Sequence, residues 1–145
     1  HLGAGSVAVA RAVTWQMTRW GVWLGVILMV VVLVARSWVP GIFGDDAIVQ
    51  AMVASALVVV ALQQPLAGVV FVLDGVLLGA GDARFLVWAQ LFALVAFAPA
   101  AWWVWRTQGS VTQLWMALTV FMLARAAAFL WRGRGSAWLV TGATR

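Results

Sequence analysis

The chain has 145 residues, of which 66% are hydrophobic and 9% are charged, with a formal net charge of +5 at pH 7. A water-soluble domain needs more polar surface, and the nine arginines that supply all the basic charge flank apolar runs, so the composition indicates a membrane protein that contacts lipid headgroups and not nucleic acid. There is no cysteine and the single histidine is His1, so we expect no metal site, no cofactor and no enzyme activity.

Residues 1–20 mix small residues with two arginines and two tryptophans. This combination favours the membrane interface, so the stretch is predicted to be an interfacial helix, with a cytoplasmic loop as the alternative. The phrase Leu-Gly-Ala-Gly-Ser at residues 2–6 is similar to Leu-Gly-Ala-Gly-Asp at residues 78–82, which ends an apolar segment. By analogy a further helix is expected before residue 1, and the chain is expected to be a fragment.

About four apolar segments are long enough to cross a bilayer, whose hydrocarbon core of about 30 Å needs about 20 helical residues. They are residues 21–39, 47–78, 85–105 and 111–131. The second is too long for a straight crossing, and Pro65 predicts a kink because proline removes a backbone donor and clashes with the preceding turn. The sequence therefore predicts an all-α membrane protein with a transmembrane part at 21–131 and a cytoplasmic tail at 132–145.

The arginines fall unevenly on the two sides of four alternating crossings. One side receives Arg11, Arg19, Arg84, Arg132, Arg134 and Arg145. The opposite side receives Arg36 and Arg106 together with Asp45 and Asp46. Because basic loops stay in the cytoplasm, both termini are predicted to be cytoplasmic in a multi-pass protein of the inner or plasma membrane.

Asp74 is the only acidic residue inside an apolar segment. A carboxylate within a membrane is costly, so Asp74 is a candidate proton or cation site. It also lies close to the end of its segment, where it could instead pair with Arg84 or cap the backbone. Both interpretations stay open at the level of sequence.

Gln63 and Gln64 beside Pro65 are candidates for lining a substrate pathway at mid-membrane depth. The alternative is that they form hydrogen bonds between helices at a structural kink. Arg125 lies close enough to its helix end for its long side chain to reach the headgroups, and snorkelling is favoured over an ion pair.

A phrase in the second segment carries a family resemblance. It consists of Gln64-Pro65, then Phe71-Val72-Leu73-Asp74-Gly75, then Leu78-Gly79-Ala80-Gly81-Asp82 and Arg84. This order resembles the multidrug and toxic compound extrusion (MATE) transporters, and within them the branch similar to the bacterial DinF proteins. The resemblance makes Gly75, Gly79, Gly81, Asp82 and Arg84 a structural motif.

The resemblance implies that the four spans correspond to helices nine to twelve of a twelve-helix fold. Such a transporter exports drugs or other organic, often cationic, compounds in exchange for H⁺ or Na⁺. Its expected partners are membrane lipids, small organic substrates and an N-terminal lobe absent from this chain. Because that lobe holds the acidic residue thought to couple protons in this family, the chain alone is not expected to transport. The alternatives are a lipid or polysaccharide flippase of the same superfamily and a small non-transporting membrane subunit.

Overall fold

The computed structural model describes residues 6–139, and this part of the chain is helical. The helices are α1 (Val7–Ala35), the 3-10 helix η1 (Val39–Phe43), α2 (Ala47–Gly79), α3 (Ala83–Arg106) and α4 (Val111–Arg134). Within the described residues, α1 to α4 are long and apolar enough to cross a membrane. The prediction of an all-α membrane protein with four spans is confirmed.

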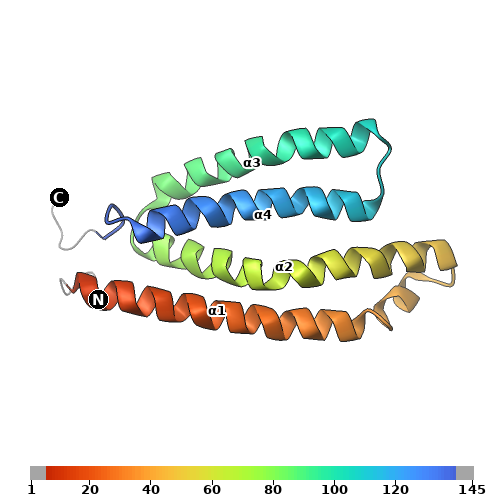
Figure 1. The fold of residues 1–145 in the computed structure, drawn as a ribbon, viewed down its shortest axis with the longest axis horizontal. Helices are drawn as coiled ribbons and strands as arrows, with labels where there is room; N and C mark the ends of the chain where they lie inside the picture. Colours follow the sequence, from red (N-terminus) through yellow and green to blue (C-terminus); the bar gives the residue numbers. More distant parts are fainter. Residues whose placement is uncertain (1–5, 140–145) are drawn as a thin grey trace.

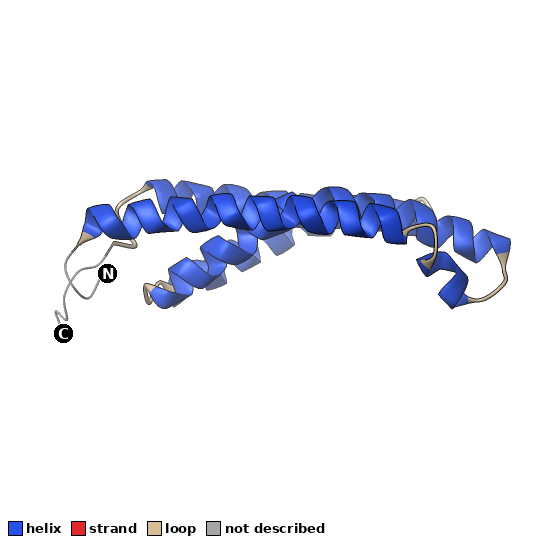
Figure 2. Ribbon diagram, turned by 90° about the horizontal axis from the view of Figure 1, so that it is seen from below, coloured by secondary structure: helices blue, strands red, loops and turns tan. Residues whose placement is uncertain are grey.

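The four long helices form a row and not a closed bundle. α1 packs on α2, α2 packs on α4, and α4 packs on α3, so the spatial order differs from the chain order (Figure 1). Seen from the side, the helices lie largely in one layer (Figure 2). A single layer leaves two broad faces that no other described helix covers, and large apolar side chains of the two inner helices, such as Leu62, Phe71 and Leu123, are exposed there. Such faces suit lipid or other membrane helices.

The helix α1 corrects the predicted start of the first span. It begins at Val7 and continues without a break through Trp20, so residues 7–20 belong to the same helix as the span. Its 29 residues correspond to about 44 Å, longer than the hydrocarbon core. Arg11 donates to the carbonyls of Arg134 and Gly135, at 3.0 and 3.3 Å, which ties the start of α1 to the end of α4.

Small residues allow α1 to approach α2 closely. Ala10, Thr14, Thr18, Gly21 and Gly25 are the buried residues of α1 and recur every three or four positions. The two threonine hydroxyls donate to the carbonyls four residues earlier, so no polar group of this stripe is left open. A Cβ on Gly21 would lie 2.7 Å from the carbonyl oxygen of Gly68, and one on Gly68 would overlap the Gly21 carbonyl. The contact is therefore backbone against backbone.

The helix α2 continues through Pro65 as one helix of 33 residues. It bows, with its middle toward α1 (Figure 1), instead of breaking. Pro65 also lies in the close contact with α1, because a Cβ on Gly25 would meet the backbone of Gln64 and Pro65. The predicted kink thus takes the form of a curve that follows the α1 contact.

Capping residues fix the turns. Asp46 accepts hydrogen bonds from the backbone N–H groups of Ile48 and Val49, at 2.8 and 3.4 Å, where α2 begins. Ser110 and Gln113 form a reciprocal capping box at the start of α4. Gly81 has φ +79°, a left-handed conformation that favours glycine in the tight turn between α2 and α3.

The end of α4 also extends beyond the prediction, to Arg134. Trp138, in the predicted tail, is only 2% exposed, and its indole N–H donates to the Gly133 carbonyl at 3.2 Å. The described start of the tail therefore packs against the helical layer. The first copy of the predicted repeat, at 2–6, falls almost entirely outside the described residues, as does 140–145.

Candidate functional site along a polar seam

Paired polar side chains cross the interface between α2, with its following turn, and α4. The pairs are Ser55 with Thr112, Gln63 with Thr119, Asp74 with Arg125, and Asp82 with Arg132. We call this row the polar seam. From one pair to the next, the residue numbers increase on both helices, so α2 and α4 run parallel. On α4 the members are six or seven residues apart, about two helical turns, which places them on one face.

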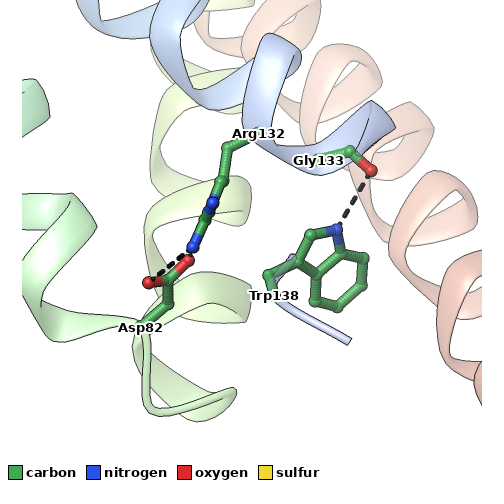
Figure 3. Close-up of polar contacts among 4 residues, drawn as sticks. All are labelled: Asp82, Arg132, Gly133 and Trp138. Carbon is green, nitrogen blue, oxygen red and sulfur yellow. Dashed lines mark hydrogen bonds and ion pairs between the residues drawn. The ribbon is translucent and has the colours of Figure 1, made fainter. Parts of the chain in front are cut away.

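The outermost pair of the polar seam is a two-point ion pair. Arg132 donates from Nε to Asp82 Oδ2 at 2.6 Å and from Nη2 to Oδ1 at 3.1 Å (Figure 3). Both side chains are shielded, at 22% and 14% exposed. The guanidinium carbon also lies 5.0 Å from the ring centroid of Phe85, which adds a cation–π contact. This pair joins the α2–α3 turn to the end of α4.

The second ion pair of the polar seam, between Asp74 and Arg125, is called the inner pair and has fewer contacts than the outer one. Arg125 Nη2 lies 3.3 Å from Asp74 Oδ2, a single contact, with the arginine side chain 13% exposed and the aspartate 39% exposed. The snorkelling of Arg125 is therefore wrong, because its guanidinium points to a carboxylate on α2. The partner predicted as an alternative for Asp74, Arg84, is exposed on α3. The nearer cation comes from α4.

Gln63 and Gln64 point in different directions. The side-chain N–H₂ of Gln63 donates to Thr119 Oγ1 at 2.6 Å and to the Trp115 carbonyl at 3.0 Å, so Gln63 is 8% exposed and bridges to α4. Gln64 donates to the Val60 carbonyl of its own helix at 3.0 Å. In the described structure the first glutamine thus belongs to the polar seam, and the second serves the backbone next to Pro65.

Replacing Gln63 with leucine should cost about 1 kcal/mol of stability, since interhelical hydrogen bonds within membranes are worth about 0.6 to 1.7 kcal/mol. The loss removes both donations to α4. The free energy of unfolding in mixed micelles checks this. Gln64→Leu is the matched control, and a larger loss for the control would contradict the assignment of Gln63 as the bridge.

The glycines of the motif differ in what they do. A Cβ on Gly75 or Gly79 would meet nothing within 4 Å, whereas Gly81 needs its left-handed φ. Asp82 follows directly and carries the outer ion pair. In the described structure the turn Gly81-Asp82 is the structural part of the motif.

Sequence reasoning missed the α4 partners of the polar seam. Thr119 accepts a hydrogen bond from a side chain of α2, and Arg125 and Arg132 form ion pairs with aspartates on α2 and its following turn, so all three make contacts between segments that are far apart in the sequence. The signal available in the sequence was their spacing of six and seven residues, which places polar groups on one face of an otherwise apolar helix.

Four candidate spans in the described residues, two of them joined by a seam of paired polar groups, define an integral multi-pass membrane protein. The sequence model of the MatE family matches residues 1–103, and the chain belongs to this family. The match includes the whole Gln63–Arg84 phrase and confirms the family that this phrase predicted. MATE proteins are transporters, in agreement with the expectation that the chain is not an enzyme.

Curated relatives in Arabidopsis thaliana agree with the family. The chain is 30% identical over 115 residues to Protein DETOXIFICATION 43, covering 79% of this chain and 22% of that protein. It is 28% identical over 123 residues to Protein DETOXIFICATION 42, covering 85% of this chain and 24% of that protein. The chain thus spans about a quarter of the length of these relatives. No solved structure matches it.

Proposed function

We propose that this chain acts within a MATE-type secondary antiporter of the DinF-like branch. The transporter exports drugs or other organic, often cationic, compounds in exchange for H⁺ or Na⁺. Its other partners are membrane lipids and the N-terminal lobe of the same transporter. The protein lies in the inner or plasma membrane, with the starts of α1 and α3 and the end of α4 on the cytoplasmic side.

The proposal rests on the contacts and the exposure of the Asp74 carboxylate. A carboxylate in a membrane helix is expensive and is retained where it binds an ion or a substrate. Asp74 has one contact to Arg125 and is 39% exposed, so part of its carboxylate is open to a further cation. A site with one acid and an accessible face fits a proton, a sodium ion or the charged group of an organic cation.

The single layer of helices supports a further lobe as partner. Secondary transporters place their sites between repeats that rock against each other. In this chain the two broad faces of the layer are apolar and lack protein cover in the described residues, which suits packing against lipid on one side and helices on the other. Small substrates would then pass between the layer and its partner lobe.

The arginine distribution supports the orientation. Arg11, Arg84 and Arg132 lie at the end of the layer that holds the α2–α3 turn, while Arg36 and Arg106 lie at the opposite end (Figure 1). The opposite end also carries Asp45 and Asp46. This bias agrees with the positive-inside rule for cytoplasmic loops.

Replacing Asp74 with asparagine in the full-length protein should reduce gradient-driven efflux of a cationic dye by about tenfold or more, because the amide keeps the shape but loses the charge. The measurement is the initial rate of dye efflux from cells at matched expression. Asp45→Asn, at an exposed loop position, is the control and should retain the full rate. Full efflux in the Asp74 variant would contradict the proposed role.

A further inference from the structure

We propose that Arg125 is an intrinsic counter-ion that occupies Asp74 when the site is empty and is displaced when a cation binds there. The inference rests on the proposed function of Asp74 and adds a second residue to that site. Arg125 would compete with the arriving cation for one carboxylate. Its role is positional, since it controls access to Asp74 from the neighbouring helix.

The two ion pairs of the polar seam provide an internal comparison. Arg125 and Arg132 lie seven residues apart on α4, and both face aspartates on the α2 side. The outer pair has two short contacts, at 2.6 and 3.1 Å, whereas the inner pair has one contact at 3.3 Å. Bidentate arginine–carboxylate pairs are the strong and geometrically specific form. The inner pair is therefore the one that can exchange its partner.

Two aromatic rings flank the Arg125 guanidinium and can bind it when it leaves the carboxylate. Its guanidinium carbon lies 5.8 Å from the ring centroid of Phe121 and 5.3 Å from that of Phe129, four residues before and four residues after it. Aromatic faces attract a guanidinium most strongly where water is scarce. When the guanidinium leaves Asp74, the two rings are its remaining contacts, so they stabilise the released state more than the paired state.

Two further features leave the pair incomplete. The Nε of Arg125 is buried and has no hydrogen-bond acceptor within residues 6–139, so one of its donors is unused. Asp74 is three times as exposed as its partner, at 39% against 13%. A cation can thus reach the open part of the carboxylate while Arg125 covers the other part. Because an arginine does not lose its proton in proteins, it must yield by movement.

The test is equilibrium binding of tetraphenylphosphonium, a small organic monocation, to the full-length protein in detergent. Arg125→Gln should tighten binding by at least about fivefold, because a competing charge is removed. Arg134→Gln is the control, because Arg134 is an exposed arginine at the end of the same helix and lies outside the polar seam, and it should leave the dissociation constant unchanged. Unchanged or weaker binding in Arg125→Gln would overturn the inference.

A second variant predicts the opposite sign and avoids the charge change. Phe121→Leu removes one aromatic ring that holds the released guanidinium while keeping an apolar side chain, so binding should weaken by about twofold or more. A purely structural role for Arg125 predicts no affinity change in either variant. Thermal unfolding of each purified variant establishes that it is folded.

The outcomes also separate this inference from the proposed function. If Asp74→Asn abolishes binding of the probe while Arg125→Gln leaves it unchanged, Asp74 is a cation site and Arg125 is not its competitor. If Asp74→Asn leaves binding intact, the proposed role of Asp74 fails and the counter-ion inference fails with it.

Discussion

Replacing Gly68 with leucine is expected to separate α1 from α2 and to cost at least about 3 kcal/mol of stability. A side chain at this position would occupy the space of the Gly21 carbonyl, which is backbone and cannot move aside without displacing the whole helix. The measurement is the free energy of unfolding of the full-length protein in mixed micelles, with monodispersity on size exclusion as a second readout.

The matched control for this substitution is Gly75→Leu in the same helix. Gly75 is exposed, and a Cβ there would meet nothing within 4 Å. Both substitutions gain about 1 kcal/mol of helix propensity, so their difference isolates the packing against α1. Equal stability of the two variants would show that the close approach of α1 and α2 is not required.

Breaking the outer ion pair of the polar seam is expected to cost about 1 to 3 kcal/mol for either Asp82→Asn or Arg132→Gln, because each leaves a shielded charge without its partner. Adding the second substitution should cost little more, since the interaction is already lost. The free energies of unfolding of the two single variants and the double variant form a double-mutant cycle, which measures the coupling between Asp82 and Arg132.

Arg84→Gln is the control for this cycle. It removes an arginine two residues from Asp82 that is exposed on α3. Its effect is expected to stay within about 0.5 kcal/mol, as for other surface positions. If the effects of the two single variants simply added in the double variant, Asp82 and Arg132 would not be coupled.

The spans were predictable because each is an apolar run bounded by charged residues, proline or glycine, and these signals act within a few residues. The same locality explains the error at α1. Arg11 and its neighbouring tryptophans are typical of a membrane interface, but Arg11 finds its acceptors at Arg134 and Gly135. A contact across more than a hundred residues leaves no mark on local hydropathy, so the sequence pattern does not show that the stretch before residue 21 packs against the end of α4.

Only the residues that α2 contributes to the candidate site were predictable. Asp74 and Gln63 stand out because polar groups in an apolar segment are rare and costly. Their partners Arg125 and Thr119 lie on another helix, and only the parallel arrangement of α2 and α4 brings them together. The distance of Arg125 from its helix end favours contact with the headgroups, whereas the structure pairs it with the acid across the seam. Pairing between helices follows from their order in the row, which the sequence pattern does not contain.

The measurement that tests the antiport proposal most directly is dye flux by the full-length protein in proteoliposomes under imposed ion gradients. We expect an H⁺ or Na⁺ gradient to drive a cationic dye in the opposite direction, and reversal of the gradient to reverse the flux. A dye flux whose direction depends on neither gradient would contradict exchange transport.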